Sequence, residues 1–390
     1  MNKNIKYQLP DYDNCCVNLI SSVAKHFKIK TNHKTLPIAD KLLKKNYKNI
    51  VVLLLDGFGK ELFNRKCDKN NFFAQCYAQD LSAVFPSSTT PATVSFKSGY
   101  TPLEHGWWAH FLYFKEIGGA VNLYLNTDAY SREPTKLNHI AHDIMPYETI
   151  HERIYQKHKD EVRCYAICPT NCRDVDGITQ VTYDSFDEMA NYIKTLCEND
   201  GKHYIYAYYD LPDRNEHHFG VYSNEVAQTL AEIEAITEYM CKNCKDTLFF
   251  ISADHGQTEV HEVRDLAKYR DLCDCMVMAT NGGTRTMNCF VKSDRKAEFR
   301  KLANKYLGDK FLILSKKEVF EKHLLGDGVM HYKVDDTLGD FLIISVSDCS
   351  LFYSTLYVPK KTLPLGGHGG LSHEEMTVPL FIYENKNKTA

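Results

Sequence analysis

The sequence of 390 residues lacks any apolar run near the roughly 20 residues that a membrane-spanning helix needs. It also lacks a basic excess, since 47 Lys and Arg stand against 50 Asp and Glu, which leaves little positive charge to neutralise a nucleic-acid backbone. No signal-peptide pattern is present, because Asp11 and Asp13 precede the short apolar stretch at residues 15–20. These absences predict a cytoplasmic protein with no membrane association and no stable nucleic-acid partner.

Cysteine, in contrast, is abundant, with 14 residues. Without an export signal, free thiols in a reducing compartment are expected rather than disulfides. Cys241 and Cys244, like Cys273 and Cys275, have the spacing of half a zinc site, but neither pair has a partner pair at the distance of a zinc finger. We therefore expect ordinary thiols at these positions.

Short, almost wholly apolar runs recur along the chain, and several of them lead directly into a polar cluster. Runs of this kind are typical of strands buried on both faces, as in a mostly parallel sheet that helices cover. The predicted strands are Ile50–Leu55, Tyr204–Tyr209, Leu248–Ile251, Phe341–Val346 and Pro379–Tyr383.

Helices are predicted between these strands, which makes an α/β sandwich the expected fold. They are Ser185–Cys197, where Ser185 and Glu188 form a capping box, and Asn224–Cys241, Lys296–Leu307 and Lys316–Leu325. Residues 107–146 and 261–286 fit the alternation poorly and are expected to cross the active edge of the sheet. We predict one catalytic domain over residues 1–390, with residues 260–365 as a smaller lobe or cap insertion within it.

Carboxylates and imidazoles stand in the polar clusters that follow the strands, or in a glycine-rich loop. In α/β sheets, ligands bind beyond the carboxyl ends of the strands. Mixed oxygen and nitrogen ligands suit zinc, manganese or iron, and the share of imidazole favours zinc. Taken singly, each residue has an ordinary explanation as a cap, a surface pair, a turn or a loop, but all these explanations would have to hold at once. The six residues are Asp56, Asp213, His217, Asp254, His255 and His368.

A candidate nucleophile lies in the hydroxyl-rich stretch that begins at Phe85. Pro91 suits the first turn of a helix, so Thr89 would stand at the helix N-terminus, where unpaired N–H groups bind phosphoryl oxygens. The alternative is that Thr89 or Thr90 only caps this helix. A hydroxyl beside metal ions can do more, because the metal stabilises its alkoxide for attack at neutral pH.

The order of these motifs resembles the alkaline phosphatase superfamily and, within it, the nucleotide pyrophosphatase/phosphodiesterase branch, also called type I phosphodiesterases. The motifs are Asp, Phe-Pro-x-x-Thr-x-Pro, Gly-x-x-Pro-x-x-His-Gly, Asp-x-x-x-His-x-x-Gly, Asp-His-Gly and His-Gly, and they lie within residues 50–383. The resemblance implies an alkaline phosphatase-like α/β/α sandwich with a mostly parallel central sheet and cap insertions. It implies a metal-binding hydrolase of phosphodiester or pyrophosphate bonds, with a small-molecule phosphodiester or nucleotide as substrate.

The resemblance also implies roles for the candidate residues. Thr89 would attack phosphorus and become phosphorylated, and water activated at a second metal would then cleave the phosphothreonine. Asp213 is preferred to Asp210 because only Asp213 has His four residues on and Gly three residues further. Two divalent ions, preferably zinc, would be held in a first site by Asp56, Thr89, Asp254 and His255 and in a second site by Asp213, His217 and His368.

The sequence departs from the family pattern at two places. Glu216 stands where the family usually has Gly, and His110 stands where an Asn often contacts a phosphate oxygen. His110 is therefore a candidate substrate contact, since an imidazole can donate a similar hydrogen bond. Trp107 and Trp108 are candidates to stack on a planar group of the substrate, with packing inside a cap as the alternative.

Three other functions stay open. A phosphonoacetate hydrolase of the same superfamily would need lysines that grip a carboxylate, for which Lys97 and Lys115 are candidates. A phosphomonoesterase would need extra positive charge, which Arg132 or Arg214 could supply. A non-catalytic binding protein would have lost a ligand or the nucleophile, and none is missing. A sulfatase is disfavoured, because no Cys-x-Pro-x-Arg motif replaces the Thr region. The sequence does not indicate an oligomeric state.

Overall fold

The structure is a computed structural model that describes residues 7–135, 139–169, 175–354 and 364–386. Its centre is a seven-stranded sheet. The strand order is β2-β18-β9-β1-β8-β6-β7, in which β9, β1, β8, β6 and β7 are parallel and β18 is antiparallel to both of its neighbours. The mostly parallel sheet is thereby confirmed. The strands are β1 (Asn49–Leu55), β2 (Tyr77–Ser82), β6 (Val162–Ile167), β7 (Ile178–Val181), β8 (Lys202–Tyr209), β9 (Thr247–Ser252) and β18 (Thr377–Asn385).

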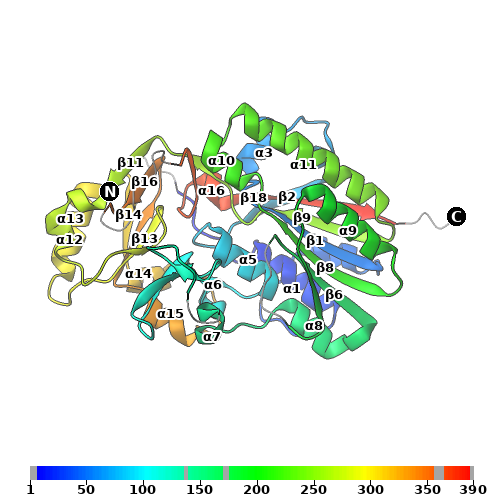
Figure 1. Cartoon of the computed structure of the whole chain (residues 1–390), viewed down its shortest axis with the longest axis horizontal. Coiled ribbons are helices and arrows are strands. Elements are labelled where there is room, and N and C mark those ends of the chain that lie inside the picture. The colour runs from blue at the N-terminus through cyan, green and yellow to red at the C-terminus, as the bar shows by residue number, and fades with distance from the viewer. Residues whose placement is uncertain (1–6, 136–138, 170–174, 355–363, 387–390) are drawn as a thin grey trace.

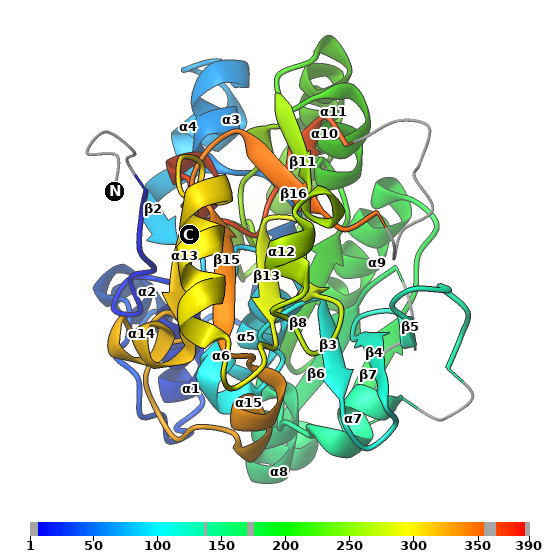
Figure 2. The same ribbon diagram turned by 90° about the vertical axis from the view of Figure 1, so that its left-hand side faces the viewer.

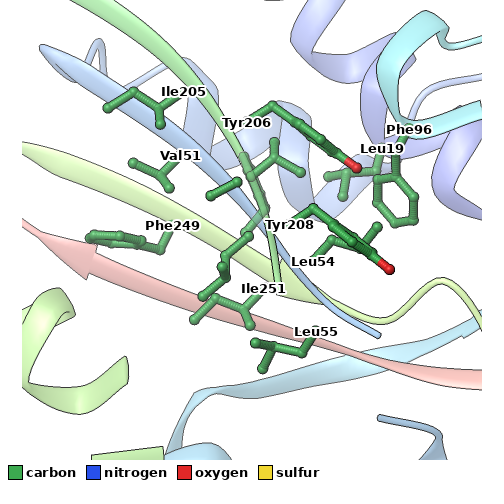
Figure 3. Packing of buried hydrophobic residues seen from close by; sticks show 14 of the residues in the cluster. Leu19, Val51, Leu54, Leu55, Phe96, Ile205, Tyr206, Tyr208, Phe249 and Ile251 are labelled. Carbon is green, nitrogen blue, oxygen red and sulfur yellow. The ribbon is translucent and has the colours of Figure 1, made fainter. Parts of the chain in front are cut away.

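Helices cover both faces of this sheet, as Figure 1 shows. One face carries α3 (Lys60–Lys66), α9 (Phe186–Glu198) and α11 (Asn224–Asn243), and the other carries α1 (Cys16–His26), α5 (Thr89–Ser98) and α8 (Ile150–His158). Strand β1 is buried at every position, and after Asn49 its sequence is wholly apolar, as a strand covered on both faces requires. In Figure 3, Leu19 of α1 and Phe96 of α5 lie beside Tyr206 and Tyr208 of β8. The predicted α/β/α sandwich is therefore present.

A second seven-stranded sheet, antiparallel throughout, lies beside the first (Figure 2). It joins residues 111–128 to residues 281–345, so both segments that fit the α/β alternation poorly contribute to it. Its order is β14 (Phe311–Ser315), β15 (Phe341–Ser345), β13 (Thr286–Cys289), β12 (Asn281–Gly282), β3 (Phe111–Phe114), β4 (Gly119–Asn122) and β5 (Thr127–Asp128). The boundaries of a cap domain stay a prediction.

One expected strand belongs to this second sheet and not to the parallel one. Residues 341–346 form β15, which pairs antiparallel with β13 and β14. Leu342 and Ile344 pack in one apolar cluster, while Phe341 and Ile343 pack in another with Phe299 of α13 (Lys296–Leu307). Because the sheet is covered on both faces here, β15 has the continuous apolar sequence of a parallel strand without being one.

The predicted helices are present with small shifts at their ends. Ser185 is the N-cap of α9 and accepts a hydrogen bond from the Glu188 N–H, which is one half of the predicted capping box. The Glu188 carboxylate accepts from the N–H of Asp184 and not from that of Ser185. Helix α13 has the predicted bounds, while α14 (Lys316–Glu321) ends four residues early. Among the residues that the structure describes, no helix combines the length and the apolar composition that crossing a membrane requires.

Short elements complete the described chain. Two-stranded sheets pair β10 (Thr258–Glu259) with β17 (Gly366–Gly367) and β11 (Glu262–Asp265) with β16 (Cys349–Phe352). The other helices are α2 (Pro37–Leu43), α4 (Phe72–Cys76), α6 (Pro102–His105), α7 (Ile140–Ile144), α10 (Asp213–Phe219), α12 (Arg270–Cys273), α15 (Tyr332–Thr337) and α16 (His373–Met376).

Candidate active site

The parallel register of three adjacent strands brings the candidate ligands together. Strand β1 lies between β8 and β9, so the chain leaves all three strands at the same edge of the sheet. Asp56 follows β1, Asp254 follows β9, and α10 begins at Asp213 shortly after β8. The predicted ligands fall into two groups in which the candidate ligand atoms lie within 4.8 Å of one another: Asp56, Asp254 and His255, and Asp213, His217 and His368.

The first group is fully buried. His255 Nε2 lies 3.4 Å from Asp56 Oδ1 and 3.3 Å from Asp254 Oδ2. The other carboxylate oxygens have donors, from the Tyr208 hydroxyl to Asp56 Oδ2 and from the Gly57 N–H to Asp254 Oδ1. Asp56 Oδ1 and Asp254 Oδ2, however, have no hydrogen-bond partner among the described residues. Two such buried oxygens beside an imidazole fit a cation, because an unpaired buried carboxylate is costly.

The pKa values of these carboxyl groups point the same way. Burial raises the pKa of Asp56 well above its usual value, and the charges of Asp254 and Asp213 raise it further. The pKa of Asp254 is also raised, chiefly by burial. The protein alone therefore disfavours two negative charges here, and a divalent cation would remove the penalty.

The second group is half-buried and lies beside the first. His217 Nε2 and His368 Nε2 lie 3.5 Å and 3.6 Å from Asp213 Oδ1, which also accepts a hydrogen bond from the amide of Gln257. The rings of His255 and His368 stack with centroids 3.8 Å apart, so the two groups are in contact. Burial and then the neighbouring imidazoles lower the pKa of His368 well below its usual value, which keeps the ring neutral as a metal ligand requires.

All three histidines are oriented by the main chain. A carbonyl oxygen can only accept, so the ring nitrogen facing it carries the proton and leaves Nε2 with its lone pair toward the carboxylates. The Nδ1 atoms donate to Gly366 O from His217 at 2.8 Å, to Gly256 O from His255 at 3.1 Å and to Ser87 O from His368 at 3.2 Å.

Thr89 is the first residue of α5 and contacts the first group. Its Oγ1 lies 3.3 Å from His255 Nε2 and 3.5 Å from Asp56 Oδ2. The side chain of the N-cap residue, Ser88, makes no capping bond. The Ser88 side chain therefore leaves the first-turn N–H groups of Thr89 and Thr90 uncapped, which is the condition for binding an anion at a helix end.

Thr90 and His110 form a different unit next to Thr89. Thr90 Oγ1 lies 2.9 Å from His110 Nδ1, and His110 Nε2 lies 3.0 Å from the Asn122 amide nitrogen. Because an amide nitrogen can only donate, His110 Nε2 accepts and Nδ1–H donates to Thr90. Burial lowers the pKa of His110 to about 4. The ring is neutral with both nitrogens engaged, so its contact with substrate stays a prediction.

The two tryptophans lie in different surroundings. Trp108 is fully buried and donates from Nε1 to Thr337 Oγ1 at 3.0 Å. Trp107 donates to Met145 O at 2.8 Å and stacks beside His139 in a separate cavity. Neither borders the cavity over Thr89 and the second group, and the ring of Trp108 packs in the apolar cluster that includes residues of the second sheet, so stacking on substrate stays a prediction.

A cavity of about 360 Å³ opens over Thr89 and the second group. Its wall on the far side from the ligands comes from the second sheet and the short strands, and it is largely apolar. No sequence motif marks these residues or Gln257, because they meet the candidate ligands only in the folded chain, as when β11 pairs with β16 and Gln257 contacts Asp213. The wall includes Phe111, Val260, Val263, Leu351 and Phe352.

An α/β/α sandwich with two groups of candidate metal ligands and a helix-terminal threonine is the arrangement of a hydrolase of the alkaline phosphatase superfamily, and the comparison with known families places the chain there. The family model of type I phosphodiesterase / nucleotide pyrophosphatase matches residues 50–371, and the chain belongs to this family.

Solved structures agree on the fold. Murine ectonucleotide pyrophosphatase/phosphodiesterase 5, solved as an inactive variant with AMP, superposes with a TM-score of 0.65 at 15% identity, over 87% of this chain and 90% of that one. Phosphonoacetate hydrolase from Sinorhizobium meliloti, solved with phosphonoacetate, gives 0.63 at 14% identity, over 88% and 92%. No match was found among curated protein sequences.

Proposed function

We propose that this protein is a metal-dependent phosphodiesterase or nucleotide pyrophosphatase that acts through a phosphothreonine at Thr89. The observation that carries the proposal is the Thr89 hydroxyl, which lies within 3.5 Å of a buried group whose two unpartnered carboxylate oxygens fit a divalent cation. The mixed donor set of carboxylate and imidazole suits zinc. One ion would be held by Asp56, Asp254 and His255, and a second by the half-buried group.

The residues would divide the reaction between them. Bound ions would neutralise charge and lower the pKa of the hydroxyl and of water. Thr89 Oγ1 would lose its proton and form a bond to phosphorus while the bond to the leaving oxygen breaks, and water would then cleave the Thr89–phosphorus ester. The first-turn N–H groups of α5 would hold the non-bridging oxygens. The inactive murine variant, in which alanine replaces a threonine, supports a threonine nucleophile.

Charge and cavity shape favour a diester substrate. Two divalent ions would be balanced by the three aspartates and a Thr89 alkoxide, so the centre would be close to neutral before substrate binds. Among the described residues that line the cavity, none is Lys or Arg, so the extra charge of a monoester gains no partner. The apolar wall suits an apolar or planar second arm, which a diester carries and a monoester lacks.

A phosphonoacetate hydrolase is the second candidate, because such an enzyme is among the structural neighbours. The lysines predicted for its carboxylate give it little support. Lys97 borders the separate cavity beside Trp107, and Lys115 is an exposed residue paired with Asp336 at 2.8 Å. The phosphomonoesterase alternative has similarly weak support, since Arg214 is exposed and paired with Asp210 at 3.3 Å.

The test is a comparison of four substrates at one pH and one zinc concentration: an aryl phosphodiester, a nucleoside 5′-monophosphate aryl ester, an aryl monophosphate and phosphonoacetate. We expect the highest kcat/KM for one of the two diesters, with Thr89→Ala as the inactive control. A preference for the monophosphate would indicate a phosphatase, and a preference for phosphonoacetate would indicate the second candidate. Turnover of none of the four by zinc-loaded protein would contradict the proposal.

A further inference from the structure

A fully buried ion pair, Arg285 with Glu375, lies beside the loop that carries His368 of the second group. Arg285 immediately precedes β13 of the second sheet, and Glu375 lies in α16 near the end of the chain. Both side chains have no exposed surface. Arg285 Nε and Nη2 donate to the two carboxylate oxygens of Glu375 at 2.7 and 2.8 Å. The guanidinium also donates to the carbonyl oxygens of Ser347 and Cys349.

Glu375 is hydrogen-bonded to the loop that carries His368, and Arg285 lies against this loop. Glu375 accepts hydrogen bonds from the N–H groups of Gly370 and Ser372, at 2.7 and 3.1 Å. Gly367 lies so close to Arg285 that a Cβ there would be 3.0 Å from Arg285 Cδ. The ion pair therefore contacts the loop on both sides of His368, at Gly367 through Arg285 and at Gly370 and Ser372 through Glu375.

The same pair reaches the first ligand group and the second sheet through the main chain. The Glu375 carbonyl accepts from the N–H of Gly256, which follows His255, at 3.0 Å. The Arg285 carbonyl accepts from the N–H of Ser345 in β15 at 2.7 Å. The side chain of Thr286 donates to the Gly369 carbonyl at 2.5 Å. Hydrogen bonds of Arg285, Thr286 and Glu375 therefore connect the segment after His255, strand β15 and the loop that carries His368.

We propose that Arg285 and Glu375 are positioning residues that aim His368 at Asp213 and thereby set the metal affinity of the second group. The proposal rests on the proposed function, because it assumes that this group holds a metal. A buried ion pair contributes little net stability compared with well-packed apolar residues, since both charges lose their hydration. Its bidentate geometry does specify one arrangement of the segments it joins, and here that arrangement includes a metal-ligating histidine.

The experiment measures the affinity of each ion in zinc-reconstituted protein by competition with chelators of graded strength. The double variant Arg285→Leu with Glu375→Gln removes both charges, while Gln keeps an acceptor for the Gly370 N–H. We expect the affinity of the weaker ion to fall about 10- to 100-fold, as for other residues that orient a metal ligand, while the tighter ion changes less than about threefold. His368→Ala marks which ion belongs to the second group.

Two further variants separate positioning from simple support of the fold. Arg285→Lys keeps the buried charge paired but cannot span both carboxylate oxygens, so it should weaken the same ion even if the double variant fails to fold. Arg264→Leu is the control for loss of a bidentate arginine, because Arg264 pairs with Asp309 at 2.7 Å in a partly exposed position and its other hydrogen bonds go to Glu262 and Tyr306.

The outcomes are distinct. Unchanged affinities in folded Arg285→Lys, or equal weakening of both ions, would overturn the positioning role and leave the proposed function standing. Failure of the wild-type protein to bind zinc would overturn both.

Discussion

The two ligand groups differ in what builds them. Asp56 follows β1 directly, Asp254 and His255 follow the neighbouring strand β9 after Ala253, and the three side chains are at most 3% exposed. Asp213 and His217 lie on helix α10 and His368 on a loop, with side-chain exposure between 15% and 33%. The first group therefore inherits its geometry from strand register, whereas the second depends on how a helix and a loop pack against the rest of the molecule.

This difference has an energetic side. The first group concentrates buried carboxylates without enough donors, which should destabilise the metal-free protein and make the first ion the more tightly held. The second group faces the cavity, where partial exposure lowers the cost of an empty site and gives substrate and water access. The predictions below test this division, in order of decreasing effect.

The largest effect is expected at the threonine that contacts only the first group. Thr89→Ala should lower kcat at least roughly a thousandfold, as loss of a nucleophile does, while both ions remain bound. Thr90→Ala, which removes a hydroxyl bonded to His110, should lower it less than about tenfold. Steady-state kinetics with metal analysis checks this, and an active Thr89→Ala beside an inactive Thr90→Ala would show that the nucleophile is one residue further on.

The second effect concerns the order in which the ions leave. Chelation of zinc-loaded protein should proceed in two phases, with the half-buried group emptied at least about tenfold faster because its ligands are more exposed. His368→Ala should bind one ion and retain its fold. A chromogenic chelator records the release, and a single phase accounting for both ions would contradict the distinction between the groups.

The third effect appears in metal-free protein. Asp254→Asn should raise its free energy of unfolding near pH 7, because the substitution removes a buried charge whose pKa is raised, chiefly by burial. Wild-type protein takes up a proton at this site as pH falls toward the ordinary Asp value, so the advantage of Asn should shrink on acidification. Denaturant unfolding of both proteins at pH 7.5 and 5 measures the difference in free energy of unfolding at each pH. A difference that grows toward acid would contradict the raised pKa of Asp254. The Asn variant should also bind the first ion poorly.

The smallest effect on activity is expected from substitution of His110. Since burial lowers its pKa to about 4, the ring stays neutral through the working range. His110→Asn should therefore lower kcat/KM less than about tenfold and leave the shape of its pH profile between pH 5.5 and 8.5 unchanged. Loss of a pH limb near 6.5 in this variant would show that His110 titrates during the reaction.

Sequence patterns predicted the parts of the molecule that depend on near neighbours in the chain. The apolar runs identified β1, β8 and β9, and the residues just after them supplied the ligand candidates, because a buried strand and its C-terminal loop are contiguous. The same criterion misassigned residues 341–346, since a strand in any sheet covered on both faces has the same composition. It also left open whether Trp107 and Trp108 face substrate or the core.

By itself, then, the sequence determined the α/β sandwich, the order of the candidate ligand residues and the threonine at the start of α5, since each depends on local periodicity, on capping or on motif order. Only the tertiary structure decided that residues 111–128 join residues 281–345 in one sheet, that Trp108 is buried, that β11 and β16 supply an apolar wall, and that Arg285 pairs with Glu375. These contacts join residues that lie tens to hundreds of positions apart. These contacts form only when the whole chain packs together, and a local sequence pattern carries no information about that packing.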